Sequence, residues 1–330
     1  MERAIFGTVD AASIVRAVDD HCRRHLGQRI VGYHFYRSSV ASVHGVELAD
    51  GRRVVVKAHQ PTLPRGHLEA VAGVQRHLAA GGFPCPRPLS RPIALGLGHA
   101  TVEEELVRGG WHDGHDPTYR AAMVRSLAEL VDRCRSSPEA KGLLRDRFLS
   151  LPPGQVWIVP HAAMFDFDAT ATGAEAIDEV AAAARSVFDD PGHDGEVLGH
   201  TDWRAENLRF DGEQVSSVYD WESLVRTTEP VLVGGVAHAF SSDWAHPPSG
   251  AQAPALDEAR AFVSEYGDAS GAVFDRADRR RMGAAYAYAT AYTARCGHAI
   301  DPDGTTEPSQ GFRSLIREHG GALIDAFLAG

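Results

Sequence analysis

The stretch that most constrains this chain runs from residue 200 to residue 222. It opens with His200-Thr201-Asp202-Trp203-Arg204-Ala205-Glu206-Asn207, and a predicted hairpin then leads through strands at 208–210 and 215–219 to Asp220. Folding the chain at the Asp211-Gly212 turn brings Asn207 beside residues 218–220. The amide oxygen of Asn207 and the carboxylate of Asp220 then form a pair of oxygen ligands suited to Mg²⁺. Asp202 is left as a separate carboxylate that can act as a base.

The spacing His-x-Asp-x-x-x-x-Asn, followed by an Asp after a hairpin, is typical of kinase catalytic loops. On these residues and on Asp220-Trp221-Glu222, the sequence resembles the aminoglycoside phosphotransferase family of small-molecule kinases, relatives of choline and homoserine kinases. Thr201 stands where that family usually has Gly, which narrows the backbone options there. The resemblance implies an α+β, bilobal protein-kinase-like fold, with a small antiparallel-sheet N-terminal lobe and a larger, mostly helical C-terminal lobe.

The resemblance also implies roles for these residues. Asp202 is the expected catalytic base, and Asn207 and Asp220 are the expected metal ligands. Arg204 is placed to touch the transferred phosphoryl group, although an ordinary surface Arg explains it nearly as well. His200 is expected to pack under the loop. The expected cofactors are ATP, with GTP as the alternative nucleotide, and Mg²⁺.

Upstream, a predicted helix at 9–27 precedes predicted strands at 30–37, 40–48 and 53–58. Of the 33 Lys and Arg residues only Lys57 and Lys141 are Lys, so Lys57 marks a place where a compact ammonium is favoured over a guanidinium. The resemblance implies that Lys57 binds the donor phosphates and pairs with a Glu on the following helix. Glu69, in the first turn of a helix predicted at 66–80, is the candidate. Its alternative role is to stabilise its own helix N-terminus.

Two further segments are candidates for nucleotide contacts. The turn between the first two strands lacks Gly-x-Gly-x-x-Gly, but Ser38 and Ser39 offer N–H and O–H donors to phosphate, and a plain polar turn is the alternative. Residues 100–108 are predicted to form the last strand of the small lobe, with main-chain groups from Glu105 to Val107 facing adenine at the hinge. We therefore expect an ATP-binding lobe at 1–106 and a catalytic and acceptor-binding lobe at 107–330.

The remainder is predicted to be mainly helical. Helices are expected at 118–135, 174–188, 254–266, 275–295 and 309–328, with Asp189-Asp190-Pro191-Gly192 ending the second and a strand at 197–199 leading into His200. Tyr286, Tyr288 and Tyr292 are either core residues or walls of an acceptor pocket. Glu222, Glu229 and Asp243 are candidates for binding an amine of the acceptor.

Charge is divided unevenly along the chain. Residues 1–106 hold 13 basic against 10 acidic side chains (+3) and residues 107–330 hold 20 against 34 (−14), which sum to −11. So acidic a chain is not expected to bind nucleic acid. No apolar run is long enough to span a bilayer, so we expect a cytoplasmic protein without a membrane partner, as a monomer or homodimer. The acidic C-terminal part favours a cationic acceptor, and solubility is the alternative explanation.

These features predict an ATP-dependent enzyme that moves the γ-phosphate to a hydroxyl of a small molecule, an antibiotic (an aminoglycoside or another class) that is cationic. A metabolic amino-alcohol or sugar kinase, similar to choline or homoserine kinase, is the nearest alternative. A nucleotide-binding scaffold without turnover is another. Such a scaffold is expected to have lost Lys57, Asp202 or Asp220, and the sequence retains all three.

Overall fold

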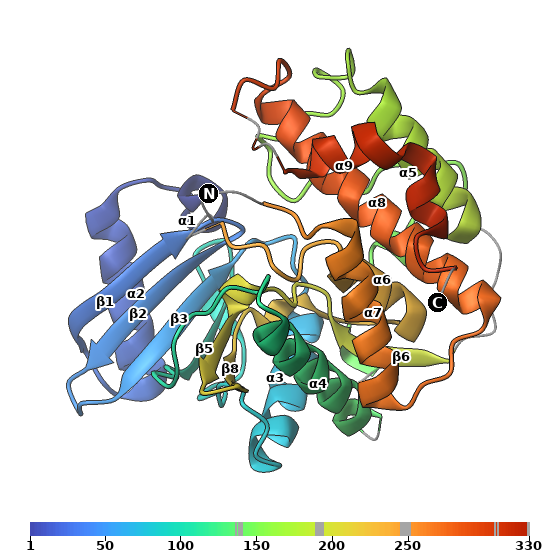
Figure 1. The fold of residues 1–330 in the computed structure, drawn as a ribbon. Helices are drawn as coiled ribbons and strands as arrows, with labels where there is room; N and C mark the ends of the chain where they lie inside the picture. Colours follow the sequence, from blue (N-terminus) through green and yellow to red (C-terminus); the bar gives the residue numbers. More distant parts are fainter. Residues whose placement is uncertain are drawn as a thin grey trace. The chain divides into compact units, whose positions relative to one another are not determined.

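The computed structural model describes residues 1–135, 137, 141–188, 195–244, 252–306, 308 and 310–328. The chain divides into two compact units, residues 1–107 with 137–144 and residues 108–136 with 145–330. The first unit is built on a five-stranded antiparallel sheet, and the second is mostly helical (Figure 1). The predicted α+β class is therefore confirmed. No helix in the described ranges combines the length and the apolar character needed to cross a membrane.

The first unit contains the sheet and three helices, and its strand order is β1-β2-β3-β5-β4. Its elements are α1 Glu2–Phe6, α2 Ala11–Leu26, β1 Ile30–Ser38, β2 Ala41–Leu48, β3 Arg53–His59, α3 Arg65–Ala80, β4 Ile93–Leu95 and β5 Gly98–Glu104. The predicted helices and the first three strands are confirmed. The strand predicted at 100–108 ends at Glu104, four residues early, and α1 and β4 were not predicted.

The two faces of this sheet differ in chemistry because side chains alternate along each strand. Val54, Val56 and Ala58 of β3 and Ala100 and Val102 of β5 join one buried cluster with α2. Figure 1 shows α2 lying along the sheet. The alternate positions of the same strands, which include Lys57, Thr101 and Glu103, face the other side. The polar residues of β3 and β5 are therefore gathered on the face that α2 does not cover.

The second unit contains six α-helices and two small sheets among its described residues, β6 with β9 and β7 with β8. Its elements are α4 Pro117–Cys134, η2 Phe148–Ser150, α5 Glu175–Phe188, β6 Glu196–His200, η3 Ala205–Asn207, β7 Leu208–Asp211, β8 Gln214–Val218, η4 Trp221–Ser223, β9 Leu224–Thr228, α6 Glu229–Ala237, α7 Leu256–Ser270, α8 Arg276–Ile300, α9 Phe312–His319 and η5 Gly320–Asp325. The predicted helix break at Asp189–Gly192 lies outside the described residues.

Two predictions for this unit were incomplete. The helix expected at 309–328, whose first residue lies outside the described residues, is divided in two, because Gly320 takes a φ of 50° and ends α9 before η5 begins. Strand β9 and helix α6 were not predicted. Helix α6 is apolar on nearly every side and almost wholly buried, so it has no helical hydrophobic period to detect.

Helix α8 is the centre of the second unit and packs against α5, α6, α9 and η5. Its middle is rich in Ala and Gly, which lets neighbouring backbones come close. A Cβ on Gly283 would lie 1.9 Å from the carbonyl oxygen of Ile324, and one on Gly234 of α6 would lie 2.0 Å from that of Met282. Any larger residue at either glycine would therefore push the helices apart.

Candidate active site

The predicted hairpin forms and sets the position of Asn207. Leu208 of β7 pairs with Val218 of β8, and the amide of Tyr219 donates to the Asn207 carbonyl at 2.9 Å. The Asn207 side chain is buried, and its Nδ2 donates to both the carbonyl oxygen (2.9 Å) and Oδ2 (2.7 Å) of Asp202. Because both partners are acceptors, they fix which end of the amide is nitrogen. The Oδ1 of Asn207 is therefore the end that remains for another ligand.

Asp220 has an unusual backbone conformation. Its φ of 59° and ψ of 47° place it in the left-handed region, and it is the only residue other than glycine with a positive φ among the residues that the structure describes. Such a conformation costs a non-glycine residue on the order of 1 kcal/mol or more and is concentrated at functional sites. The strain lies at the residue predicted from sequence as a metal ligand.

His200 holds the loop from beneath. Its side chain is wholly buried, and its Nε2–H donates to the Tyr219 carbonyl at 2.8 Å. The rings of Trp203 and Trp221 meet it edge-on, each with its centroid 5.7 Å away. Burial lowers the pKa of His200, although nearby carboxylates act in the opposite direction. This enclosed imidazole is bonded to the Tyr219 carbonyl and packed between two indole rings, so it is placed to position the loop.

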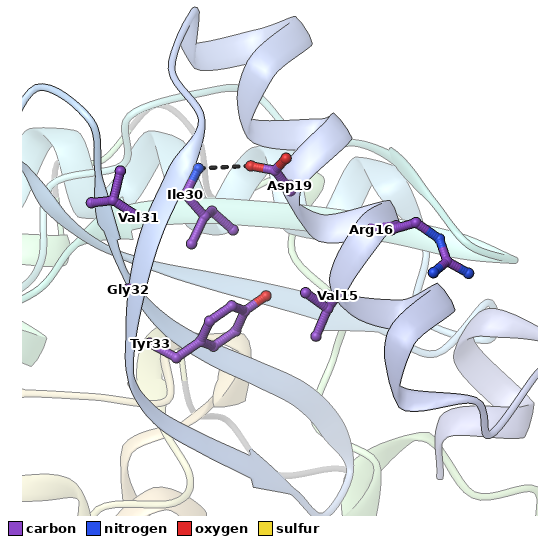
Figure 2. A pocket seen from close by; sticks show the side chains of 7 residues that line it. All are labelled: Val15, Arg16, Asp19, Ile30, Val31, Gly32 and Tyr33. Carbon is purple, nitrogen blue, oxygen red and sulfur yellow. Dashed lines mark hydrogen bonds between the residues drawn. The ribbon is translucent and has the colours of Figure 1, made fainter.

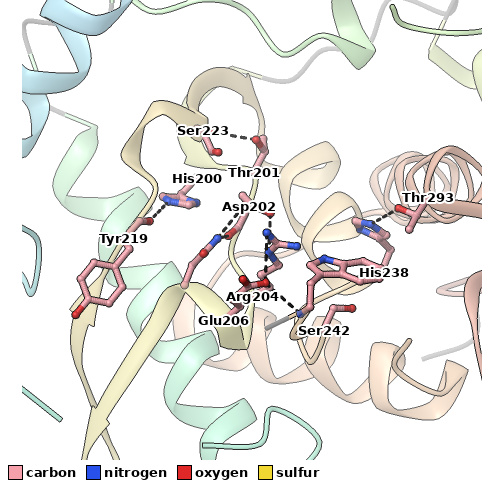
Figure 3. A network of polar contacts seen from close by, with 12 residues as sticks. His200, Thr201, Asp202, Arg204, Glu206, Tyr219, Ser223, His238, Ser242 and Thr293 are labelled. Carbon is pink, nitrogen blue, oxygen red and sulfur yellow. Dashed lines mark hydrogen bonds and ion pairs between the residues drawn. The ribbon is translucent and has the colours of Figure 1, made fainter. Parts of the chain in front are cut away.

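Arg204 lies beside the predicted base. Its Nε is 3.1 Å from Oδ1 of Asp202, and one terminal nitrogen is 3.7 Å from Oε2 of Glu206. Glu206 also accepts a hydrogen bond from the amide of Trp244 at 3.1 Å. Figure 3 shows Arg204, Glu206 and His238 on one side of Asp202, with His200 and Tyr219 on the other. Asp202 is thus held by Asn207 through one oxygen and approached by Arg204 at the other.

In the first unit, Lys57 is buried and paired with a residue that was not predicted. Its Nζ lies 3.6 Å from Oε1 of Glu103, and these side chains are only 5% and 7% exposed. Gln75 of α3 donates to the other oxygen of Glu103 at 3.1 Å. The predicted pairing of Lys57 with Glu69 is wrong. Glu69 is 42% exposed and pairs with Arg65, one turn earlier on α3, at 2.9 Å.

The remaining predicted nucleotide-binding residues lie in the first unit, and several of their polar groups already have partners. The Ser38 hydroxyl donates to Glu2 at 2.9 Å, and the Ser39 amide donates to the Ala41 carbonyl at 3.2 Å. The Glu105 amide donates to the Arg53 carbonyl at 3.2 Å, while Val107 is largely exposed. Ser38 and Ser39 would have to exchange these partners to bind a phosphate.

Residues 42–272 match the model of a protein family described as "Phosphotransferase enzyme family". The chain belongs to this family. The match covers more than half of the sequence and includes Lys57, residues 200–207 and the hairpin that follows them. It confirms the resemblance to small-molecule kinases and makes the chain an enzyme of the phosphotransferase family.

Solved structures of other phosphotransferases share the fold. An amicoumacin kinase, solved with AMP-PNP, Ca²⁺ and Ami, superposes with a TM-score of 0.61 at 11% identity, over 89% of this chain and 88% of that one. A spectinomycin phosphotransferase, solved with ADP and spectinomycin, has a TM-score of 0.54 at 12% identity, over 94% and 93%. A choline/ethanolamine kinase family protein from Mesorhizobium loti has a TM-score of 0.52 at 15% identity, over 91% and 88%. The protein-kinase-like fold is therefore confirmed. No curated protein sequence matches this phosphotransferase.

Sequence reasoning missed several polar residues of this phosphotransferase. No role was predicted for Glu103, yet the apolar alternation of Ala100 and Val102 identifies the face on which it lies. Glu206 lies within the recognised motif, but no spacing rule assigns it a partner. His161 and His238 are isolated in the sequence, and only the fold brings them near Asp202 and Arg204, whose charges act on both.

Neither a metal cluster nor the pocket beside α2 identifies the site. Within the described ranges, no group of three or more His, Cys, Asp or Glu side chains is arranged to hold a metal. A pocket of about 290 Å³ lies between α2 and the start of β1, lined by Val15, Arg16, Asp19, Ile30, Val31, Gly32 and Tyr33 (Figure 2). The Ile30 amide donates to Asp19 there at 2.7 Å. None of its lining residues is a predicted nucleotide ligand, so the pocket gives no support to a nucleotide role.

Proposed function

We propose that this enzyme transfers the γ-phosphate of ATP to a hydroxyl group of a small molecule, within the classes that its structural neighbours bind, such as antibiotics. The observation that carries the proposal is the arrangement of Asp202, Asn207 and Asp220. Asn207 holds Asp202 through two hydrogen bonds, and the hairpin leads from Asn207 directly to the strained Asp220. A base fixed in position beside two oxygen ligands is what phosphoryl transfer requires.

Asn207 and Asp220 fit a divalent ion. The Nδ2 of Asn207 is used by Asp202, which leaves Oδ1 as a neutral oxygen ligand, and Asp220 supplies a carboxylate. Mg²⁺ is commonly held by one or two protein oxygens together with nucleotide phosphates and water, so a cluster of three acids is not needed. A bound Mg²⁺ would neutralise charge on the donor phosphates. Lys57 is assigned to donor phosphates, as predicted from the sequence.

Asp202 is assigned the role of base. As the acceptor hydroxyl oxygen forms its bond to the γ-phosphorus, the bond from that phosphorus to the β,γ-bridging oxygen breaks and ADP leaves. The hydroxyl proton passes to the Asp202 carboxylate and then to solvent. The side chain of Asp202 is 36% exposed, so it is open to an acceptor although its orientation is fixed. A weak base suffices, because the reaction depends mainly on positioning and charge neutralisation.

Arg204 is assigned to the transferred phosphoryl group. Its contacts with Asp202 and Glu206 employ part of a guanidinium that has five N–H groups in a fixed plane. The remaining donors suit phosphate oxygens. The same side chain can therefore orient the base and stabilise charge that develops on the phosphoryl group.

The proposal is tested with Asp220→Asn and a matched control, Asp211→Asn, an exposed carboxylate at the tip of the same hairpin. Thermal shift with Mg²⁺ and ATP measures nucleotide binding. ADP release with a panel of amino alcohols, aminoglycosides, macrolides and nucleoside antibiotics measures transfer. We expect Asp220→Asn to lose Mg²⁺-dependent transfer while Asp211→Asn retains it. ATP binding without acceptor-dependent ADP release by the unaltered enzyme would instead indicate a nucleotide-binding scaffold.

A further inference from the structure

Two neighbouring positions of β1 face opposite sides of the sheet in the first unit. Tyr36 pairs with His44 of β2, and the centroids of their rings lie 5.2 Å apart. His44 alternates with Val46, which belongs to the buried cluster with α2, so Tyr36 faces the side that α2 covers. Arg37 is the next residue, and successive side chains of a strand point to opposite faces. Arg37 therefore faces the side that α2 leaves uncovered.

A second contact gives the same orientation for β1. Phe35 and Arg37 are two positions apart in a regular part of the strand, so they share a face. Phe35 lies against Gly45 of β2, because a Cβ on that glycine would be 2.2 Å from the Phe35 ring. Gly45 pairs with Val55, two positions before Lys57 on β3. The Phe35 ring thus lies on the same face as Lys57, and so does Arg37.

Arg37 and Lys57 stand in one row across the sheet. Arg37 pairs with Val43 of β2, and Val43 pairs with Lys57 on its other side. Neighbouring strands are about 4.8 Å apart, so the main chains of Arg37 and Lys57 are separated by about 10 Å. Lys57 is buried and Arg37 is exposed. Two long basic side chains at this separation can reach one chain of phosphates.

The charges of this row leave room for a second cation. Lys57 is paired with Glu103 at 3.6 Å, and the pair carries no net charge. The acid that β2 places on this face, Glu47, lies four residues beyond Val43 toward the other end of the strand. Mg²⁺ neutralises the charge of a triphosphate only in part, so net positive charge from the protein favours its binding. Arg37, Lys57 and Glu103 together carry one positive charge.

Glu2 of α1 holds β1 on both sides of Arg37. One carboxylate oxygen accepts from the Tyr36 hydroxyl, and the other accepts from the Ser38 hydroxyl at 2.9 Å. Both bonds lie on the side of the sheet that α2 covers, because Tyr36 and Ser38 alternate with Arg37. Helix α1 is itself anchored by Ile5, which is wholly buried in the apolar cluster with α2. The Glu2 carboxylate therefore fixes the stretch of main chain from which Arg37 projects.

From this arrangement we infer that Arg37 binds the donor phosphates beside Lys57, and that Glu2 is a positioning residue that holds Arg37 from the opposite face of the sheet. The inference rests on the proposed phosphotransfer from ATP and adds a phosphate ligand to it. It also gives Ser38 a different role from the phosphate contact expected from the sequence. The Ser38 hydroxyl anchors β1 to Glu2, because it points to the face opposite Lys57.

The first test measures ATP affinity by calorimetric titration of the full-length enzyme in the presence of Mg²⁺. We expect Arg37→Gln to raise Kd for ATP about tenfold, a difference of about 1.4 kcal/mol, and Arg37→Lys to restore most of the loss. Kd for adenosine, which has no phosphates, should not change. Arg52→Gln is the control, since it removes the same charge from the turn at the opposite end of the sheet.

An unchanged Kd for ATP in Arg37→Gln would overturn the inference. A loss no larger than that of Arg52→Gln, or an equal loss of adenosine binding, would overturn it as well. Acceptor-dependent ADP release by the unaltered enzyme tests phosphotransfer separately. Its absence, beside a loss of ATP affinity confined to Arg37→Gln, would remove transfer and support the phosphate contact. No ATP binding by the unaltered enzyme would overturn both.

The second test separates position from charge. Glu2→Ala removes a negative charge, which by itself would favour the binding of an anion. We expect Glu2→Ala instead to raise Kd for ATP about fivefold, because a smaller fraction of molecules holds Arg37 in the binding position. Glu2→Gln should restore part of the loss, since its amide oxygen still accepts from one hydroxyl group. Asp50→Ala removes a carboxylate from the turn between β2 and β3 and should not weaken ATP binding.

The double variant of Glu2→Ala with Arg37→Gln decides whether Glu2 acts through Arg37. We expect this variant to bind ATP no more weakly than Arg37→Gln alone, because the group that Glu2 positions is already absent. Losses of affinity that multiply in the double variant would overturn the positioning role of Glu2. Tighter ATP binding by Glu2→Ala alone would overturn it too.

Discussion

The pairing of Lys57 with Glu103 predicts that the carboxylate of Glu103, and not that of Glu69, stabilises the Lys57 ammonium. Both members of the pair are buried, and 3.6 Å separates Nζ from Oε1. At that distance two unit charges attract by about 5 kcal/mol for an effective dielectric constant of about 20, before the cost of their lost hydration. Removing the charge of one member of a buried pair typically costs about 3–5 kcal/mol, because the other member loses that attraction.

Glu103→Gln keeps the size of the side chain and a partner for Gln75 but removes the charge. We therefore expect it to lower the free energy of unfolding by about 3 kcal/mol and to weaken ATP binding. Glu69→Gln is the matched control, because Glu69 makes an exposed pair with Arg65 within α3. That change should cost no more than about 0.5 kcal/mol and should leave ATP binding unaltered. Urea unfolding of the full chain and calorimetric titration with ATP measure the two effects.

A double-mutant cycle makes the test specific to Lys57. Combined with Lys57→Met, Glu103→Gln should show a coupling energy above about 1 kcal/mol, whereas Glu69→Gln should be additive to within about 0.5 kcal/mol. Stronger coupling of Lys57 to Glu69 than to Glu103 would refute this account of the first unit. It would restore the pairing that the sequence pattern favoured.

Two further predictions concern acid stability and backbone strain. Burial lowers the pKa values of His21 and His44 to about 4, so an unfolded chain binds a proton at each site more readily than the folded one between about pH 6.5 and pH 4. The free energy of unfolding is therefore not reduced above about pH 6.5, and it decreases as the pH falls, by about 2 kcal/mol per histidine at about pH 5. Urea unfolding across this range should show the decrease. His44→Gln should make the free energy of unfolding depend less steeply on pH. Asp220→Gly should raise the free energy of unfolding by about 1 kcal/mol while abolishing transfer, because glycine accepts the φ of 59° without strain. Asp220→Ala is the control for the lost side chain: if Asp220→Gly is no more stable than Asp220→Ala, the left-handed backbone is not strained.

The candidate site at residues 200–220 could be predicted from the sequence because its residues are brought together by local spacing. Asp202 and Asn207 are five positions apart, and a short hairpin brings Asp220 back to them, so one turn signal and a strand alternation suffice to place all three. The same motif also predicted that His200 packs under the loop. These features require no knowledge of how distant parts of the chain pack.

The residues that the sequence did not reveal depend on packing between distant elements. Glu103 reaches Lys57 because β5 pairs with β3 in one particular register, and a helical pattern pointed to Glu69 instead. The irregular segment 156–172 is bound by side chains of α8 about 130 positions away in the chain, as the hydrogen bond of Tyr288 to Val156 shows across 132 residues. Periodicity correctly placed Tyr288 on a helix, but it could not distinguish a core residue from one that also holds a loop. In the structure Tyr288 is both.

The most direct test of the account is phosphate transfer by Asp202→Ala, measured in a single turnover with excess enzyme and labelled ATP beside the dissociation constant for ATP. Asn207 donates to the carbonyl oxygen and to Oδ2 of Asp202. The change therefore removes the base and the second of these hydrogen bonds, while Asp220 and Lys57 are unaltered. The account predicts a loss of about 10²–10⁴-fold or more in the transfer rate with ATP affinity within a few fold of the unaltered enzyme. Transfer at a near-normal rate in Asp202→Ala would contradict it.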